Sequence, residues 1–149
     1  MNSPRISWEI REEFEKDEFE YTQYKSYTEE GSFIPGDYIE KELRVWNNHS
    51  GSEDVQDALD CSLIIAFKNF EDSFLLNMIT VYVDSVEKPV EIDIDKGVVS
   101  IGSLSGVANA GIKDNSSNFK NLKIIIGPIP SNIKSELKSM YFYLEYMTE

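Results

Sequence analysis

The chain has 149 residues, of which 41% are hydrophobic, so it is long enough to bury the core of one domain. Its 27 acidic and 14 basic residues give a formal net charge of −13, which disfavours contact with nucleic-acid phosphates or with an anionic membrane surface. No stretch approaches the roughly 20 apolar residues of a membrane span, so we expect neither a nucleic-acid partner nor a membrane partner.

Residues 1–30 differ in composition from the rest because acidic and aromatic side chains are mixed without a clear period. Ile6, Trp8 and Ile10 alternate as a strand does, whereas the spacing from Ile10 to Phe14 also suits one side of a helix. We predict an N-terminal arm that packs back on the domain or on a neighbouring copy. Whether the arm is a strand, a helix or disordered stays open.

The remaining residues, 31–149, are predicted to form one β-sandwich domain. Seven segments alternate between apolar and polar side chains, or are apolar throughout, and turn residues separate them. These segments are residues 39–47, 59–67, 75–84, 90–95, 98–104, 121–126 and 135–146. Because no βαβ pattern appears, we predict an all-β fold, an antiparallel sandwich of about seven strands, with a barrel as the second choice.

Three local features refine this prediction. Val90, Ile92 and Ile94 are expected to face the core, and the following Lys-Gly turn predicts a hairpin with the next strand. Residues 103–121 are rich in Gly, Ser, Asn and Ala and are expected to form a long loop. The two prolines in residues 127–130 are expected to end the strand before them, because proline lacks a ladder donor.

Residues capable of catalysis are few. His49 is the only histidine and Cys61 the only cysteine, and we expect a loop imidazole and a buried thiol rather than a catalytic pair. Asp93 and Asp95 lie two apart before a glycine, but an exposed acidic strand face explains them better than a calcium loop. We therefore predict no enzyme activity, no catalytic residues, no cofactor and no metal site.

Aromatic side chains on the outward parity are the other candidate signal, since sugar rings stack on flat apolar faces. Trp46, Tyr141 and Tyr143 lie on the parity opposite the predicted core face. With Trp8 of the arm, they are the possible partner or glycan contacts. The alternative is that a loop, the arm or a neighbouring subunit covers them.

The order of turns and strands resembles the immunoglobulin-like β-sandwich domains of bacterial and phage surface and virion proteins. The resemblance covers about residues 36–146: Gly36-Asp37, the strand ending in Val45-Trp46-Asn47, Gly51, Asp57-Ala58, and Gly127-Pro128-Ile129-Pro130 before a last alternating strand. The arm and the 103–121 loop depart from the pattern. The resemblance implies a scaffold or interaction module.

Together these features favour a non-enzymatic structural protein, such as an accessory protein of a phage tail, baseplate or neck. We expect it to be made in the cytoplasm, to be assembled into the virion with other virion or surface-assembly proteins, and to form a homo-oligomer through its sandwich and arm. The alternative is a carbohydrate-binding module for cell-surface glycans.

Overall fold

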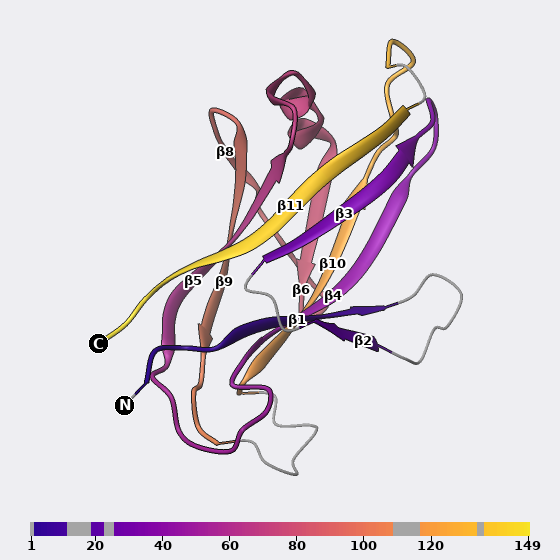
Figure 1. Ribbon diagram of the computed structural model, residues 1–149. Coiled ribbons are helices and arrows are strands. Elements are labelled where there is room, and N and C mark those ends of the chain that lie inside the picture. Colours follow the sequence, from indigo (N-terminus) through magenta and orange to yellow (C-terminus); the bar gives the residue numbers. More distant parts are fainter. Residues whose placement is uncertain (1, 12–18, 23–25, 109–116, 134–135) are drawn as a thin grey trace.

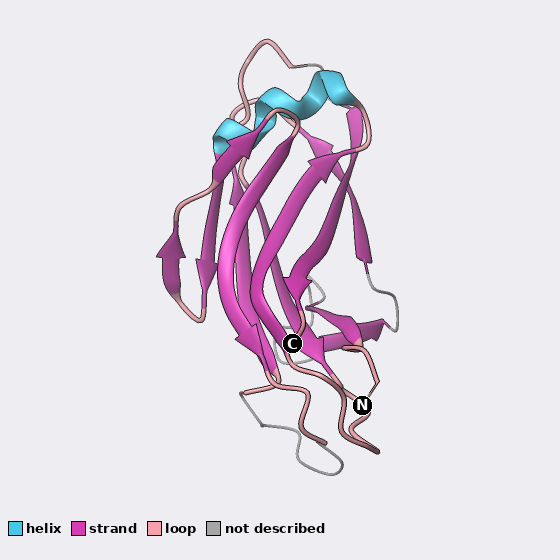
Figure 2. Ribbon diagram, turned by 90° about the vertical axis from the view of Figure 1, so that its left-hand side faces the viewer, coloured by secondary structure: helices cyan, strands magenta, loops and turns pink. Residues whose placement is uncertain are grey.

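The computed structural model describes residues 2–11, 19–22, 26–108, 117–133 and 136–149. Most of these residues form two antiparallel sheets that face each other, joined at one end by a 3-10 helix (Figures 1 and 2). The prediction of an all-β, antiparallel fold is confirmed. No helix in the described part of the chain is long and apolar enough to span a membrane.

The first sheet has six strands. In spatial order they are β2 (Phe19–Thr22), β1 (Ile6–Arg11), β4 (Ile39–Asn47), β10 (Phe119–Ile126), β6 (Ile79–Val83) and β7 (Val86–Lys88).

The second sheet has five strands, in the order β3 (Ser26–Phe33), β11 (Glu136–Met147), β5 (Ala58–Phe67), β9 (Lys96–Leu104) and β8 (Glu91–Asp93). The 3-10 helix η1 (Phe70–Met78) connects β5 to β6 across the end of the sandwich. The described residues thus form eleven strands, so the prediction of about seven is not confirmed. The extra strands are β7 and the three strands that begin in the first 30 residues.

The predicted arm contributes to both sheets. β1 pairs with β4 of the same chain, Trp8 lies opposite Val45, and Trp8 is 0% exposed. β3 pairs with β11 and runs across residue 30, the position where we placed the boundary between arm and domain. The start of the chain is therefore part of the packed core.

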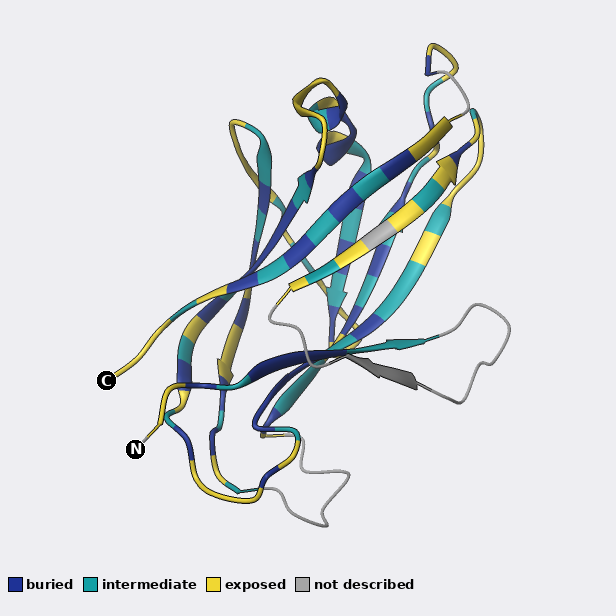
Figure 3. Cartoon of the chain, viewed as in Figure 1, coloured by how far each residue is buried: buried dark blue, intermediate teal, exposed yellow. Residues whose placement is uncertain are grey.

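The core lies between the sheets and consists of the inward-facing side chains of β1, β3–β6 and β9–β11 together with residues of η1 (Figure 3). Alternation explains this pattern, because successive side chains of a strand point to opposite faces. Its largest fully buried members include Trp8, Phe33, Leu43, Leu63, Ile65, Leu122 and Phe142. The inward parity predicted for β4 and β11 matches the burial that the structure shows.

Two local predictions are wrong. Residues 75–78, predicted as the start of a strand, belong to η1, where Leu75 and Leu76 are both buried although they are neighbours in sequence. Ile92 and Ile94 were expected in the core but are 45% and 82% exposed. β8 is an edge strand at the rim of its sheet, so its alternating pattern does not face the sandwich interior. The predicted hairpin between β8 and β9 is present.

Candidate functional site

The stretch that holds the only histidine lies at the end of the sandwich nearest the termini. It carries two fully buried asparagines, Asn47 and Asn48, and a third, Asn118, is buried beside them. Asn47 Oδ1 accepts a hydrogen bond from Arg5 N (2.9 Å), and its Nδ2 donates to the carbonyl of Gln56 (3.0 Å). These contacts connect the N-terminal segment to the loop that precedes β5.

The other two asparagines bind the loop that follows β9. Asn48 Nδ2 donates to the Gly106 carbonyl at 2.9 Å, and Asn118 Nδ2 donates to the carbonyls of Ser105 (2.8 Å) and Val107 (2.9 Å). Asn48 has a φ of 60°, a left-handed conformation that asparagine tolerates. Asn47, Asn48 and Asn118 thus join the N-terminal segment, the loop before β5 and the loop after β9. Their side chains pair backbone groups that would otherwise lack hydrogen-bond partners.

The predicted contact residue Trp46 lies on the outer face of the six-stranded sheet but is only 2% exposed. Phe119 packs against it with ring centroids 4.6 Å apart, and His49 meets it edge-on at 4.7 Å. The indole Nε1 donates to a Glu9 carboxylate oxygen, which is 3.7 Å from His49 Nε2. Burial lowers the pKa of His49, and the nearby Glu9 charge opposes this effect only in part.

The four aromatic residues predicted as contacts do not come together. Trp8 is in the core and Trp46 is on the outer face of the six-stranded sheet. Tyr141 and Tyr143 are half-buried on the outer face of the other sheet, opposite Ala66 and Ile64 of β5. In this structure neither tryptophan ring presents a face to solvent.

Cys61 is 0% exposed, and its Sγ donates to the Ala58 carbonyl at 3.3 Å. Burial raises the pKa of the Cys61 thiol from 9.0 to about 11, and the adjacent Asp60 charge acts in the same direction. No group of three or more possible metal ligands occurs among the residues that the structure describes.

The raised Cys61 pKa predicts a loss of stability at alkaline pH. The unfolded chain releases the thiol proton near pH 9, whereas the folded chain keeps it until about pH 11. The stabilisation is therefore complete below pH 9 and lost as the pH rises towards 11, by about 2 kcal/mol. Urea denaturation between pH 8 and 11 measures it. Cys61→Ala should remove this part of the pH slope, and an identical slope in the variant would contradict the assignment.

The opposite end of the sandwich has a different character. Large apolar side chains are exposed there on three separate connections: Ile34 and Tyr38 between β3 and β4, Phe70 and Phe74 on η1, and Ile94 between β8 and β9. Their exposed fractions run from 44% to 82%. We call these five residues the apolar tip. Figures 1 and 2 place η1 at this end, away from both termini.

Backbone hydrogen bonds hold two of the three connections, the β3–β4 connection and η1, to the connection between β10 and β11. Gly36 N donates to the Ile129 carbonyl (2.8 Å), and Ile129 N donates to the Asp37 carbonyl (2.9 Å). Gly127 N donates to the Met78 carbonyl of η1 (3.0 Å). The backbone that carries Ile34, Tyr38 and the end of η1 is therefore part of one hydrogen-bonded network.

A buried ion pair anchors η1 beneath the tip. Lys138 of β11 is 7% exposed, and its Nζ lies 3.0 Å from a carboxylate oxygen of Asp72 in η1. The amine also contacts Glu136. Burial lowers the Lys138 pKa, but the hydrogen bonds to Glu136 and Asp72 outweigh it, so the pKa is raised and the amine stays charged at neutral pH.

Sequence reasoning did not find the tip. Its residues come from three connections far apart in the chain, and single apolar residues in connections carry no periodic signal. The phenylalanines of η1 adjoined a segment that was predicted as a strand. The signal in the sequence was the presence of large apolar side chains where turns were predicted.

Comparison with protein-family models and with curated proteins gives no match for this chain. Among solved structures, one match is AvmM, described as catalysing macrocyclization in alchivemycin A biosynthesis. It shares 14% sequence identity, with 78% of this chain and 72% of that chain covered and a TM-score of 0.34. A likeness at this level carries no conclusion about fold or function.

Proposed function

We propose that this protein is a non-enzymatic interaction module that docks onto a partner protein through its apolar tip. One observation carries the proposal. Among the side chains that the structure describes, every exposed aromatic residue, namely Tyr38, Phe70 and Phe74, belongs to the tip. Aromatic side chains are enriched at protein interfaces and supply much of the binding energy there, whereas apolar residues scattered singly over a surface need no explanation.

The charges around the tip favour a basic partner. Tyr38 follows Asp37, Phe70 precedes Glu71, and Ile94 lies between two aspartates. The chain as a whole carries a net charge of −13, so a second acidic surface would be repelled. We propose that the partner presents an apolar patch surrounded by lysine and arginine.

The order of the strands bears on the subclass of the sandwich. In immunoglobulin-like domains three pairs of consecutive strands share a sheet. Here, from β3 onward, only β6 with β7 and β8 with β9 do so, and the other consecutive strands cross between sheets. We infer a jelly-roll arrangement in place of the immunoglobulin-like one. Jelly rolls occur in viral capsid and lectin domains. A shared fold does not by itself assign either a capsid or a lectin function to this chain.

The setting that we propose is an assembled virion, in which the chain is an accessory protein and several copies associate. The exposed aromatic residues of the tip and the acidic composition suit a docking protein in such an assembly. Because β1 and β3 belong to the sheets, the exchange of an arm between copies would involve residues of the core. We therefore place the main contact at the tip.

Photo-crosslinking tests the tip directly. A benzoylphenylalanine at position 70 replaces one aromatic side chain with another, and the same group at Val86, the first residue of β7 and 56% exposed, is the matched control. We expect one discrete adduct from position 70, with a basic protein of the particle, and none from position 86. The pair Phe70→Ser and Phe74→Ser should weaken binding of the identified partner about 100-fold.

The outcomes separate the parts of this proposal. Equal adducts from both positions, or no adduct from position 70, would refute docking through the tip. A discrete partner that is absent from purified particles would refute the virion setting alone.

A carbohydrate-binding module remains the second candidate function. The aromatic residues that suggested it in the sequence no longer support it. Trp46 is covered, and Tyr141 and Tyr143 lie on the opposite sheet. A groove on the outer face of the six-stranded sheet is the observation that favours this function, and its geometry is described next.

A further inference from the structure

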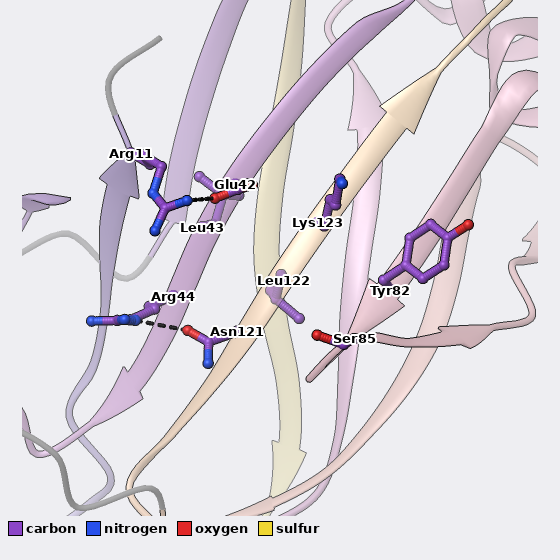
Figure 4. Close-up of a pocket in the computed structure, with 9 residues that line it drawn as sticks. All are labelled: Arg11, Glu42, Leu43, Arg44, Tyr82, Ser85, Asn121, Leu122 and Lys123. Carbon is purple, nitrogen blue, oxygen red and sulfur yellow. Dashed lines mark hydrogen bonds and ion pairs between the residues drawn. The ribbon is translucent and has the colours of Figure 1, made fainter. Parts of the chain in front are cut away.

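A groove of about 600 Å³ lies on the outer face of the six-stranded sheet, across β1, β4, β10 and β6 (Figure 4). The register places its side chains in rows. Lys123 of β10 lies opposite Glu42 of β4 on one side and Tyr82 of β6 on the other, and Asn121 lies opposite Arg44. With adjacent strands about 4.8 Å apart, the row from β1 to β6 spans about 14 Å. The volume of the groove is typical of small-ligand sites.

The charge of the groove is opposite to that of the chain. Three of its lining residues are cations, Arg11, Arg44 and Lys123, and Glu42 is the one acid that lines it. The whole chain, by contrast, has a net charge of −13. Glu42 forms an ion pair with Arg11. Arg44 and Lys123 are therefore the cations that would chiefly attract an anionic ligand here, although the protein as a whole repels anions.

Two of the cations are held in defined positions. Arg44 Nε donates to Asn121 Oδ1 at 2.7 Å, and its guanidinium carbon lies 5.2 Å from the centre of the Phe119 ring. Lys123 Nζ lies 2.9 Å from a carboxylate oxygen of Glu40, and both side chains are about half exposed, so a ligand carboxylate can share or replace this weak surface contact. A guanidinium fixed by a hydrogen bond and an aromatic ring is pre-organised to receive a carboxylate.

The other lining groups suit hydroxylated rings. Tyr82 is half-buried and brings an aromatic side chain to one end of the groove, Ser85 adds a hydroxyl group near it, and Asn121 adds an amide group beside Arg44 (Figure 4). Sugars combine apolar ring faces with many hydroxyl groups, so they match such a set. Three cations are few for a nucleic-acid backbone, which the net charge also disfavours.

We propose that this groove binds an acidic oligosaccharide, whose carboxylates contact Arg44 and Lys123 while a sugar ring packs on Tyr82. The proposal rests on the second candidate function and names its site and ligand class. It is independent of docking through the tip, which lies on different residues.

The test uses the full-length protein and isothermal titration with oligogalacturonate, hyaluronan oligosaccharides and sialyllactose as acidic probes. Neutral galacto-oligosaccharide and a poly-glutamate peptide of matched charge are the comparison ligands. We expect at least one acidic saccharide to bind with an affinity that falls as salt is added, and about tenfold or more tighter than the neutral saccharide and the peptide.

The variants locate the site. Arg44→Gln, Lys123→Ala and Tyr82→Ala should each weaken binding about tenfold, whereas Tyr82→Phe, which keeps the ring, should bind as the wild type does. Lys68→Ala removes the same charge from an exposed position at the tip end and should have no effect. Thermal denaturation of each variant confirms that it is folded.

Several results would overturn the proposal. They are no binding of any acidic saccharide, equal binding of the neutral one, or equal losses from Lys68→Ala and Lys123→Ala. Poly-glutamate binding of equal strength with the same sensitivity to the variants would show a general anion groove and refute the saccharide assignment. Failure here leaves the crosslink from position 70 unaffected, so the two functions are tested separately.

Discussion

Trp8→Ala is expected to lower the free energy of unfolding by about 3–5 kcal/mol, which is a large part of the stability of a domain of this size. Trp8 is 0% exposed and lies opposite Val45 in the register of β1 and β4. Removal of the indole leaves a cavity between the sheets that the surrounding strands cannot close completely. Urea denaturation followed by circular dichroism measures the change.

Tyr38→Ala is the matched control, because it removes an aromatic ring that is 65% exposed and should cost less than about 1 kcal/mol. Equal small effects of both substitutions would contradict the packing of β1 in the core. A large effect of Trp8→Ala would also mean that residues 1–30 cannot simply be deleted to test whether copies exchange their arms. The deletion would remove part of the core along with any contact between copies.

Asp72→Ala is expected to destabilise the protein by about 2–3 kcal/mol, because the buried Lys138 amine loses its partner in η1 and keeps only its contact with Glu136. Glu136→Ala should cost much less, since the Glu136 side chain is 56% exposed. The raised pKa of Lys138 gives the pair a pH dependence. Its contribution is complete below the ordinary lysine pKa of 10.5 and is lost as the pH rises through the higher folded value.

A double variant tests whether charge or shape matters at this position. Asp72→Leu combined with Lys138→Met replaces the pair with apolar side chains of similar size. It should recover most of the stability that Asp72→Ala loses, because no unpaired charge remains buried. A double variant as unstable as the single one would show that the ion pair itself is required to hold η1.

The parts of the fold that depend on local period were predictable from the sequence. β4, β10 and β11 alternate along their length, and their inward residues pack against the opposite sheet. Predictions failed where the burial of a segment depends on which strands lie beside it in the sheet. The pattern around Ile92 is that of a core strand, but an edge position leaves it 45% exposed. Local pattern does not reveal the position of a strand in its sheet.

The candidate sites show the same limit. Parity placed Trp46 correctly on an outer face, but it does not say that Phe119 and His49 cover the ring. The tip and the groove are each built from several elements, so neither forms a motif in the sequence. Lys123 and Tyr82 become neighbours only because β10 pairs with β6 in one particular register.

The position of β11 between β3 and β5 in the five-stranded sheet has a consequence for how the chain folds. Its neighbour β3 pairs Ser26 with Tyr143, a separation of 143 − 26 = 117 residues. Contacts between such distant residues make folding slow, on the order of milliseconds to seconds. During synthesis β3 and β5 both wait for β11, which leaves the ribosome after every other strand described, with their inner edges unpaired. Slower translation at reduced temperature would prolong this exposed stage, whereas chaperones that cover strand edges would protect it.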